Sequence, residues 1–279
     1  MDLLVSTGWL ADHLRDPGLR VADVRWYLPA PGKGREQYAA GHIPGAVFFD
    51  LDRDLSAPGG KAGGAQGRHP WPSEEQVARV MGAAGIDAAT NVVAYDDQGG
   101  AIAARLWYVL LAHGHERVAV LDGGIAKWMA EGRPLETAVP AVAPRTFGGR
   151  LRPGWVVTKE ELRVPDPQRL VFDARAPERY RGATESIDPR AGHVPGAVNA
   201  PFAANLTGGP QPVLRSPEDL RAHYAALGAE SREPIVYCGS GVTACHDLLA
   251  LRRAGLGGRL YAGSWSEWSS NPDLPIENG

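Results

Sequence analysis

The sequence predicts an α/β protein with two tandem domains, each of which is a parallel sheet flanked by helices. Two observations lead to this prediction. A set of short sequence elements occurs twice in the same order, and within each copy Val- and Ile-rich runs alternate with helical stretches. Such alternation is typical of parallel strands that are connected by helices. The 279 residues also suffice for two domains of about 100–150 residues each.

The repeat is plainest in a heptapeptide that contains a glycine, a histidine and a proline. Residues 41–47 read GHIPGAV, and residues 192–198 read GHVPGAV. A short apolar run containing an aspartate precedes each copy, with Asp23 in the first half and Asp173 in the second. These matched elements indicate that one structural unit occurs twice.

Further pairs of elements follow the two heptapeptides in the same order. They are the strand candidates 91–95 and 234–237, the helical stretches 102–113 and 242–254, and the strand-and-turn elements 118–124 and 259–264. A tryptophan follows the last pair, at Trp128 and Trp268. The offset between the halves runs from 151 residues, between 42 and 193, to 140 residues, between 128 and 268. Chance does not explain so many ordered matches.

A proline-rich stretch separates the two halves. Pro140, Pro144 and Pro153 interrupt any regular element there, because proline lacks the backbone N–H that helices and sheets use. We therefore predict an N-terminal domain at 1–138, a linker at 139–154 and a C-terminal domain at 155–279.

Composition and charge exclude several classes of partner. The net charge of −3 gives no reason to expect nucleic acid or an anionic membrane. No stretch approaches the roughly 18 consecutive apolar residues of a membrane helix. The first residues lack a basic region followed by a long apolar run, so a signal peptide is not expected. We expect a cytoplasmic protein.

The chain has two cysteines, Cys238 and Cys245, and their number limits their chemistry. Two cysteines supply neither a disulfide framework nor a four-cysteine zinc site. Cys245 falls within the predicted helix, where core packing is the favoured interpretation and a redox partner for Cys238 the alternative. No metal and no organic cofactor are expected.

The loop after the predicted strand 234–237 is the best candidate for chemistry. Functional groups of parallel sheets gather at the carboxyl ends of strands, and Cys238 stands at such an end. Gly239 and Gly241 allow unusual backbone conformations, which can turn several N–H groups inward at the start of a helix. A cradle of this kind binds anions and favours the thiolate of the cysteine. The loop therefore predicts a nucleophilic Cys238.

Two chemistries use a thiolate in an anion cradle. Cysteine phosphatases carry an arginine six residues after the cysteine, whereas this chain has Ala244 at that place. Phosphatase activity is therefore disfavoured. The other chemistry is sulfur transfer, in which the cradle stabilises a persulfide.

The paired heptapeptides and the loop Cys238-Gly239-Ser240-Gly241-Val242-Thr243-Ala244 resemble the tandem rhodanese and 3-mercaptopyruvate sulfurtransferase family. The resemblance covers nearly the whole chain and implies two rhodanese-like domains. Members that prefer thiosulfate typically carry Arg-Lys after the cysteine, and members that prefer 3-mercaptopyruvate carry Gly-Ser. The Gly239-Ser240 pair thus implies the mercaptopyruvate donor, with thiosulfate as the alternative. In the first half Asp96 replaces the cysteine, which implies that this domain is catalytically inactive.

The resemblance also assigns roles to individual residues. Arg179 matches the arginine that binds the substrate carboxylate, and Arg190 is the nearest candidate for a second one. Ser240, His69 and Asp52 match, in order, a proposed serine–histidine–aspartate relay for protons. Backbone N–H groups of Gly239 to Ala244, among them those of Gly241, Val242 and Thr243, are expected to hold the persulfide of Cys238.

The expected reaction transfers the donor sulfur to Cys238 and then to a thiophilic acceptor. The acceptor is cyanide, a small thiol or a thioredoxin-like protein, and nothing in the sequence requires a second subunit. A non-catalytic binding module is the alternative of a different class, since many rhodanese-like domains only bind. The retained Cys238 and its intact loop argue against that alternative.

Overall fold

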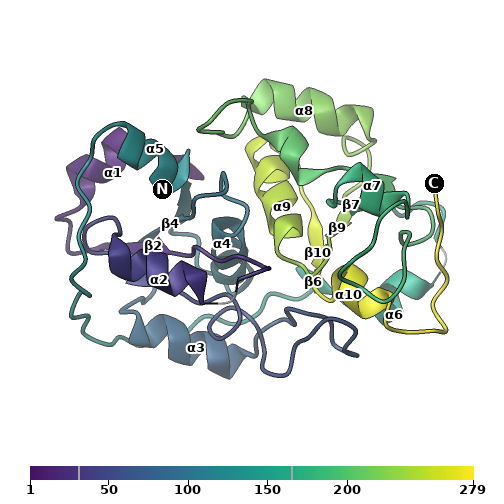
Figure 1. Ribbon diagram of the computed structural model, residues 1–279, viewed down its shortest axis with the longest axis horizontal. Coiled ribbons are helices and arrows are strands. Elements are labelled where there is room, and N and C mark those ends of the chain that lie inside the picture. The colour runs from purple at the N-terminus through teal and green to yellow at the C-terminus, as the bar shows by residue number, and fades with distance from the viewer. Residues whose placement is uncertain (31, 165) are drawn as a thin grey trace. The chain divides into compact units, whose positions relative to one another are not determined.

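The structure is a computed structural model, and it describes residues 1–30, 32–164 and 166–279. These residues form two compact units, each with a five-stranded sheet (Figure 1). The first unit comprises Met1–Leu55, Pro72–Arg152 and Gly208–Leu214. The second unit comprises Ser56–Trp71, Pro153–Thr207 and Arg215–Gly279. The two units therefore exchange two short segments, which the linear division at 139–154 does not anticipate.

The first unit has a parallel sheet with the strand order β1-β5-β4-β2-β3. Its strands are β1 (Leu4–Val5), β2 (Leu19–Asp23), β3 (Val47–Phe48), β4 (Asn91–Tyr95) and β5 (Val118–Leu121). Its helices are α1 (Thr7–His13), α2 (Lys33–Ala40), α3 (Glu74–Ala83), α4 (Ala103–Ala112) and α5 (Gly124–Ala130). The predicted alternation of strands and helices is thus confirmed.

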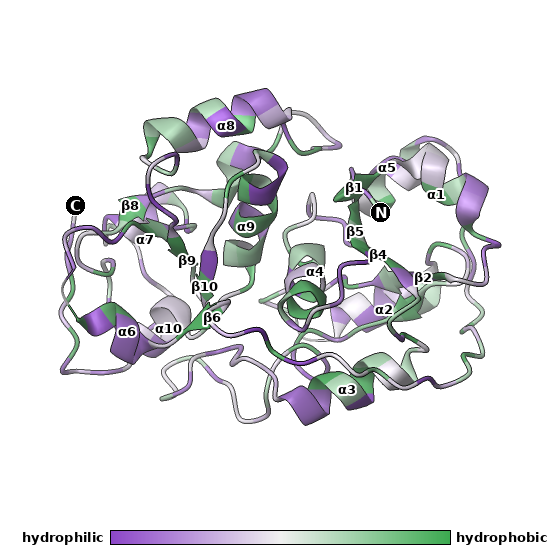
Figure 2. Cartoon of the chain, turned by 180° about the vertical axis from the view of Figure 1, so that it is seen from behind, coloured by the Kyte–Doolittle hydropathy of each residue, from purple (hydrophilic) through white to green (hydrophobic). Residues whose placement is uncertain are grey.

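Both faces of the first sheet are buried. Successive side chains of a strand point to opposite faces, so the two faces of β4 can be followed through neighbouring residues. Val93 and Tyr95 pack in one hydrophobic cluster with residues of α1, α2 and α5. Val92 and Ala94 are also fully buried, and α4 contacts β4 and β5. All ten residues of α4 are buried, and Figure 2 shows this helix and the strands in mainly hydrophobic colours.

The second unit repeats this topology with the strand order β6-β10-β9-β7-β8, again parallel throughout. Its strands are β6 (Val156–Val157), β7 (Val171–Asp173), β8 (Val198–Asn199), β9 (Ile235–Tyr237) and β10 (Arg259–Tyr261). Its helices are α6 (Lys159–Arg163), α7 (Pro177–Tyr180), the 3-10 helix η1 (Phe202–Asn205), α8 (Pro217–Ala226), α9 (Thr243–Arg253) and α10 (Ser264–Trp268). The two sheets are the duplicated unit that the sequence repeat predicts.

Helices cover both faces of the second sheet as well. Tyr237 and Tyr261 pack in one cluster with Leu162 of α6 and with Trp265 and Trp268 of α10. The helices α9 and α8 pack against the other face, and α9 contacts β9, β10 and α8 (Figure 1). The strand β9 is therefore covered on both sides, which fixes the position of the loop that follows it.

Local sequence signals explain where several helices begin. Ser6, Ser73 and Ser216 each precede a helix, and their hydroxyl oxygens accept a hydrogen bond from the backbone N–H three residues later. Such caps satisfy N–H groups that have no partner within the helix. Helix α8, which starts after Ser216, also has Pro217 in its first turn. The N–H that proline lacks would have no partner within the helix at that position.

The histidines and tryptophans of the repeat have the same structural role in both units. His42 stacks on Tyr38 and bonds its carbonyl, and His193 does the same with Tyr180. Trp128 donates its indole N–H to the carbonyl of Pro134, and Trp268 donates to that of Pro275. These residues hold the end of each unit in place, as expected for groups that recur in a domain without the cysteine.

The segment Ser56–Trp71, which we call the 56–71 loop, packs on α10 of the second unit. The backbone N–H of Arg68 donates to Ser266 Oγ at 2.9 Å, and Ser270 Oγ donates to the carbonyl of Gly64 at 3.1 Å. The loop also closes on itself, since the N–H of Lys61 bonds the carbonyl of Gly67. These bonds bring residues from the first quarter of the chain to the second sheet.

Among the described residues, no helix has both the length and the apolar character needed to cross a bilayer.

Candidate active site

Cys238 lies directly after β9, at the carboxyl end of a strand that is buried on both faces. Its carbonyl accepts a hydrogen bond from Trp265 N, and its N–H donates to Ser264 Oγ at 3.1 Å. The next carbonyl, of Gly239, accepts from Ser266 N. The start of α10 therefore fixes the backbone of Cys238 from both sides, and the thiol is only 2% exposed.

Ser264 is a supporting residue that sequence reasoning missed. It has a φ of 55°, and among the described non-glycine residues it alone has a positive φ. This left-handed conformation is unfavourable for a residue with a side chain. The Ser264 hydroxyl compensates by bonding Cys238 N and the carbonyl of Tyr261. The repeat carries the signal, because Gly124 has the same φ at the matching place in the first unit.

The turn of the loop requires Gly241. Its φ is 73°, and a Cβ there would lie 2.4 Å from the carbonyl oxygen of Ala262, well inside contact distance. Gly99 has a φ of 69° at the matching place in the first unit. Val242 then ends the loop, and Thr243 opens α9, so that their backbone N–H groups belong to the helix start.

Ser240, two residues after Cys238, contacts His69 of the 56–71 loop. Ser240 Oγ and His69 Nδ1 share a hydrogen bond of 2.8 Å, and both side chains are buried. The 56–71 loop delivers His69, although 171 residues separate it from Ser240. The structure thus places two of the three predicted relay residues in contact.

Asp52 belongs to the first unit, where one of its carboxylate oxygens accepts a hydrogen bond from the indole N–H of Trp26 at 2.9 Å. His69 and Ser240 belong to the second unit. The participation of Asp52 in the relay stays a prediction.

Arg179 faces Gly239. A Cβ on Gly239 would lie 3.2 Å from Nη1 of Arg179, which places that nitrogen in contact with the loop. The Nε and Nη2 groups of the same arginine donate to Glu185, and Nη2 also donates to Asp188. The predicted substrate-binding arginine is therefore held by two carboxylates and turned toward the residue after Cys238.

Arg68 is a second cation at the same place, and sequence reasoning missed it. A Cβ on Gly239 would lie 3.0 Å from its Nη2. Its Nη1 donates to Asp188 at 2.8 Å. The only signal in the sequence is its position next to His69, since any segment that delivers His69 to Ser240 also brings Arg68 close.

Arg190 makes different contacts. Its guanidinium donates to the backbone carbonyls of Trp268, Ser269, Asn271 and Leu274, all of which follow α10 or end it. These bonds describe an arginine that holds the C-terminal segment. Its role in substrate binding stays a prediction.

Burial and ion pairs set the electrostatics around the arginines. Burial raises the pKa of Asp188 above the ordinary carboxyl value, and the neighbouring Glu185 adds to the rise against the opposing effect of Arg68. Burial also acts to raise the pKa of Glu185, but the hydrogen bonds from Arg179 and from two backbone N–H groups outweigh it, so the pKa is lowered. A charged Glu185 therefore anchors Arg179 at neutral pH.

The matching loop of the first unit holds a carboxylate in a cradle of backbone N–H groups. Oδ1 of Asp96 accepts from Gln98 N and Gly100 N, and Oδ2 accepts from Ile102 N and Ala103 N, at 2.7 to 2.9 Å. Burial raises the pKa of this carboxyl group, and the four N–H groups oppose the rise. The loop of the first unit is thus suited to a side chain whose anionic atoms lie two bonds beyond Cβ.

Cys245 lies inside α9 and is fully buried. Its Sγ contacts the carbonyl oxygen of Gly241 at 3.3 Å, one helical turn earlier. This environment agrees with core packing.

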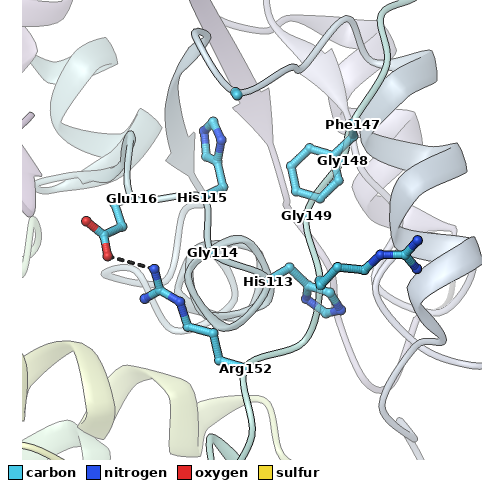
Figure 3. Close-up of a pocket in the computed structure, with 10 residues that line it drawn as sticks. His113, Gly114, His115, Glu116, Phe147, Gly148, Gly149 and Arg152 are labelled. Carbon is cyan, nitrogen blue, oxygen red and sulfur yellow. Dashed lines mark hydrogen bonds and ion pairs between the residues drawn. The ribbon is translucent and has the colours of Figure 1, made fainter.

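The first unit also contains a pocket of about 410 Å³ between the end of α4 and the segment 147–152. Figure 3 shows His113, His115 and Phe147 around it, with an ion pair between Glu116 and Arg152 at 2.8 Å. Burial lowers the pKa of both histidines. The lining residues include no nucleophile, and none of them was predicted as a site residue.

Comparison with known proteins supplies the family. The sequence model of the rhodanese-like domain matches residues 6–131 and 158–271, one match in each half. The chain belongs to the rhodanese-like family. The predicted resemblance and the predicted tandem fold are thereby confirmed.

Individual relatives match along the whole chain. A probable 3-mercaptopyruvate sulfurtransferase from Pseudomonas aeruginosa is 43% identical over 99% of this chain and 98% of the relative. A thiosulfate sulfurtransferase from Bos taurus is 36% identical over 95% of this chain and 91% of the relative. The solved structure of the 3-mercaptopyruvate sulfurtransferase from Leishmania major has a TM-score of 0.85 at 31% identity, covering 99% of this chain and 76% of that one. The prediction of a sulfurtransferase is therefore confirmed.

Proposed function

We propose that this sulfurtransferase takes the sulfur of 3-mercaptopyruvate onto Cys238 as a persulfide and passes it to a thiophilic acceptor. One observation carries the proposal: the residue after Cys238 is a glycine against which the Arg179 guanidinium lies, and the next residue is hydrogen-bonded to His69. Three consecutive residues of the loop thus supply the nucleophile, contact the carboxylate-binding cation Arg179 and bond the proton carrier His69. These are the three groups that this donor requires.

The first step balances without a cofactor. The Cys238 thiolate attacks the donor sulfur, the S–S bond forms, and the C–S bond breaks. The bonding electrons leave with carbon as the enolate of pyruvate, and the thiol proton of the donor is lost. Protonation of the enolate gives pyruvate and leaves Cys238 as a persulfide anion.

The second step regenerates the enzyme. Cyanide attacks the outer sulfur of the persulfide and leaves as thiocyanate, while Cys238 returns to the thiolate. A small thiol or a thioredoxin-like protein reacts in the same way and leaves as a persulfide. The first step adds one sulfur atom to Cys238 and the second removes it, so the enzyme ends the cycle in its starting oxidation state.

Ser240 and His69 are the candidates for moving the proton. Their bond of 2.8 Å links a hydroxyl of the loop with an imidazole, the side chain that most often serves as general acid and base. The donor thiol supplies a proton and the enolate consumes one, so a pair that takes and returns a proton completes the step.

Asp96 provides an internal analogue for the persulfide. The carboxylate oxygens of aspartate lie two bonds beyond Cβ, and the outer sulfur of a cysteine persulfide does too. In the first unit four N–H groups meet the carboxylate at that distance. The matching positions in the second unit, at the offset of 142 between 96 and 238, are Ser240, Val242, Ala244 and Cys245. Because α9 begins two residues earlier than α4 and the N–H of Cys245 donates to the carbonyl of Val242, the correspondence holds for the loop as a whole and not for each N–H group. This correspondence supports stabilisation of the persulfide anion by the loop and the start of α9.

Gly239 supports 3-mercaptopyruvate rather than thiosulfate as donor. A Cβ at this position would already lie 3.0 to 3.2 Å from two guanidinium groups, closer than nearly all Cβ contacts. The arginine that thiosulfate-preferring members carry here would require these guanidinium groups to shift. A glycine leaves the guanidinium in place for the planar carboxylate of mercaptopyruvate.

The test is the initial rate of sulfur transfer from 3-mercaptopyruvate and from thiosulfate, side by side with cyanide as common acceptor. We expect a clear preference for 3-mercaptopyruvate and no rate with Cys238→Ala. A preference for thiosulfate would contradict the proposed donor and leave the persulfide mechanism standing. No rate with either donor, on folded and reduced protein, would favour a binding module.

A further inference from the structure

We infer that Arg68 is the second arginine of the donor-binding site and that, with Arg179, it clamps the carboxylate of the sulfur donor. The inference rests on the proposed function, because it assigns a residue to the binding of the proposed substrate. It identifies a specificity residue outside the duplicated α/β repeat, on the 56–71 loop.

The free edges of the two guanidinium groups converge on one point. Nη2 of Arg68 lies 3.0 Å and Nη1 of Arg179 lies 3.2 Å from a Cβ placed on Gly239. Within the described part of the chain, neither of these two nitrogens has a hydrogen-bond partner. Two cations therefore direct unused N–H groups to the residue that follows the nucleophile.

Carboxylates hold another nitrogen of each guanidinium group, whereas Nε of Arg68 is buried without a hydrogen-bond partner among the described residues. Asp188 bridges the pair, since Oδ1 accepts from Arg68 at 2.8 Å and Oδ2 accepts from Arg179 at 3.0 Å. Glu185 binds Arg179 from another side. The side chain of Asp188 is fully buried, and those of Arg68 and Arg179 are 11% and 21% exposed. Such anchoring orients the two forks before substrate binds, which lowers the entropic cost of binding.

A planar carboxylate fits this arrangement. Guanidinium groups bind carboxylates through parallel N–H···O bonds, and two arginines can each take one oxygen. The two buried carboxylates balance the two arginines, so the charge of the donor is the extra anion that the outward N–H groups would meet. Arg190, which the resemblance suggests for this role, donates to four backbone carbonyls instead.

The 56–71 loop delivers Arg68 and His69 as neighbours. The N–H of Arg68 is bonded to Ser266 on α10, and the φ of Gly67 is 78°. A Cβ on Gly67 would lie 2.7 Å from the carbonyl of Gly263 and 2.8 Å from Ser266 Oγ. Gly67 thus allows the close approach of the loop to α10 that brings Arg68 to Gly239.

The experiment compares steady-state transfer from 3-mercaptopyruvate to cyanide in the wild type, Arg68→Met and Lys61→Met. Lys61 is exposed on the same loop, so its variant removes one positive charge without touching the arginine pair. We expect Arg68→Met to raise KM about 10- to 100-fold with little change in kcat, the loss expected for one charged hydrogen-bond partner. Lys61→Met should match the wild type.

Competitive inhibition by pyruvate gives a readout that a purely structural role would not move selectively. Pyruvate carries the carboxylate and no sulfur, so its inhibition constant should rise in Arg68→Met by a similar factor. Arg68→Lys keeps the charge but loses the fork, and an intermediate KM is expected. If Arg68→Met does not fold, the KM and the pyruvate inhibition of Arg68→Lys decide the matter.

The outcomes separate this inference from the proposed function. A wild type that transfers sulfur from 3-mercaptopyruvate, with unchanged KM and unchanged pyruvate inhibition in the Arg68 variants, would overturn the role of Arg68 alone. A wild type that takes no sulfur from 3-mercaptopyruvate would overturn both.

Discussion

The two strand-to-helix loops of the duplicated unit, after β4 and after β9, occupy the same place in their sheets and differ in what their first side chain does. They also differ in where the helix begins, since α9 starts at Thr243, two residues earlier than α4 at the offset of 142. Asp96 places a carboxylate among four N–H groups, and the first loop is satisfied by its own side chain. Cys238 occupies the same place, with Gly241 matching Gly99 in its positive φ. A thiol ends one bond earlier than a carboxylate, so the persulfide is the form of the cysteine that reaches as far as Asp96.

The helices after the two loops also differ in their buried polar side chains. Arg105 of α4 is buried and donates to the carbonyl of Leu55. Asp247 of α9, 142 residues later, is buried and accepts from Asn205 Nδ2 at 2.7 Å. Duplication thus preserved the packing of each helix while the buried polar groups changed. Fold and chemistry are therefore separable within one chain. Substitutions in the loop after β9 should change catalysis, and substitutions in the loop after β4 should change stability.

The largest effect is expected at the nucleophile. Cys238→Ala should lower sulfur transfer by about four orders of magnitude or more, because no other group can carry the sulfur. Cys245→Ala, which removes the other buried thiol, should keep the rate within about twofold at temperatures below unfolding. Rates under saturating donor check this, and equal losses in both variants would contradict the distinction between the two cysteines.

The next effect concerns the proton carriers. Ser240→Ala and His69→Gln should each lower kcat with 3-mercaptopyruvate by about 100-fold, since proton transfer contributes about this much. Thiosulfate leaves as sulfite, which needs no proton on carbon, so the residual rate with thiosulfate should change far less. Equal losses with both donors would assign Ser240 to the shape of the loop instead.

A smaller effect, on stability, is expected in the first loop. Asp96→Ala leaves four buried N–H groups without their acceptor, and the free energy of unfolding should fall by about 2–4 kcal/mol. Cys238→Ala at the matching position should lower the free energy of unfolding less, by about 1 kcal/mol, because the thiol does not accept four backbone hydrogen bonds as Asp96 does. Urea unfolding of both variants measures the difference. Equal costs would show that the two loops are not as different as their side chains suggest.

The smallest effect concerns Asp247. Burial raises its pKa well above the ordinary carboxyl value of 3.8, and the bond from Asn205 opposes the rise only in part. A raised pKa means that the group favours folding when protonated. Its contribution is complete below 3.8 and is lost as pH rises through the raised pKa.

The variant Asp247→Asn cannot ionise, so it should escape this loss. Relative to the wild type, its free energy of unfolding should rise between acid and neutral pH. Thermal unfolding at several pH values checks this. A difference between the two proteins that stays constant with pH would contradict a raised pKa for Asp247.

Much of the fold followed from the sequence because repetition and periodicity are local signals. The paired heptapeptides, the alternation of strands and helices and the place of Cys238 after a buried strand are all read along the chain. The contact between Ser240 and His69 also followed, through the resemblance. What could not be read is the exchange of the 56–71 loop, because its partners on α10 are nearly 200 residues away.

The positions of Arg68, Ser264 and Arg190 also depend on segments far away in the sequence. Arg68 acquires its position from the loop that carries it, and nothing in its own neighbourhood indicates a charge pair. Ser264 needed the repeat, since only Gly124 at the matching place reveals a left-handed backbone. Arg190 is the nearest candidate that the resemblance offers for a second arginine, yet its guanidinium donates to four backbone carbonyls near the end of the chain.

The most direct test of the account is the intact mass of the reduced protein after brief exposure to 3-mercaptopyruvate without an acceptor. The account predicts a gain of one sulfur atom in the wild type and in Cys245→Ala, none in Cys238→Ala, and loss of the added mass when cyanide is supplied. A wild type whose mass does not change, or a Cys238→Ala variant that gains sulfur, would contradict the persulfide on Cys238.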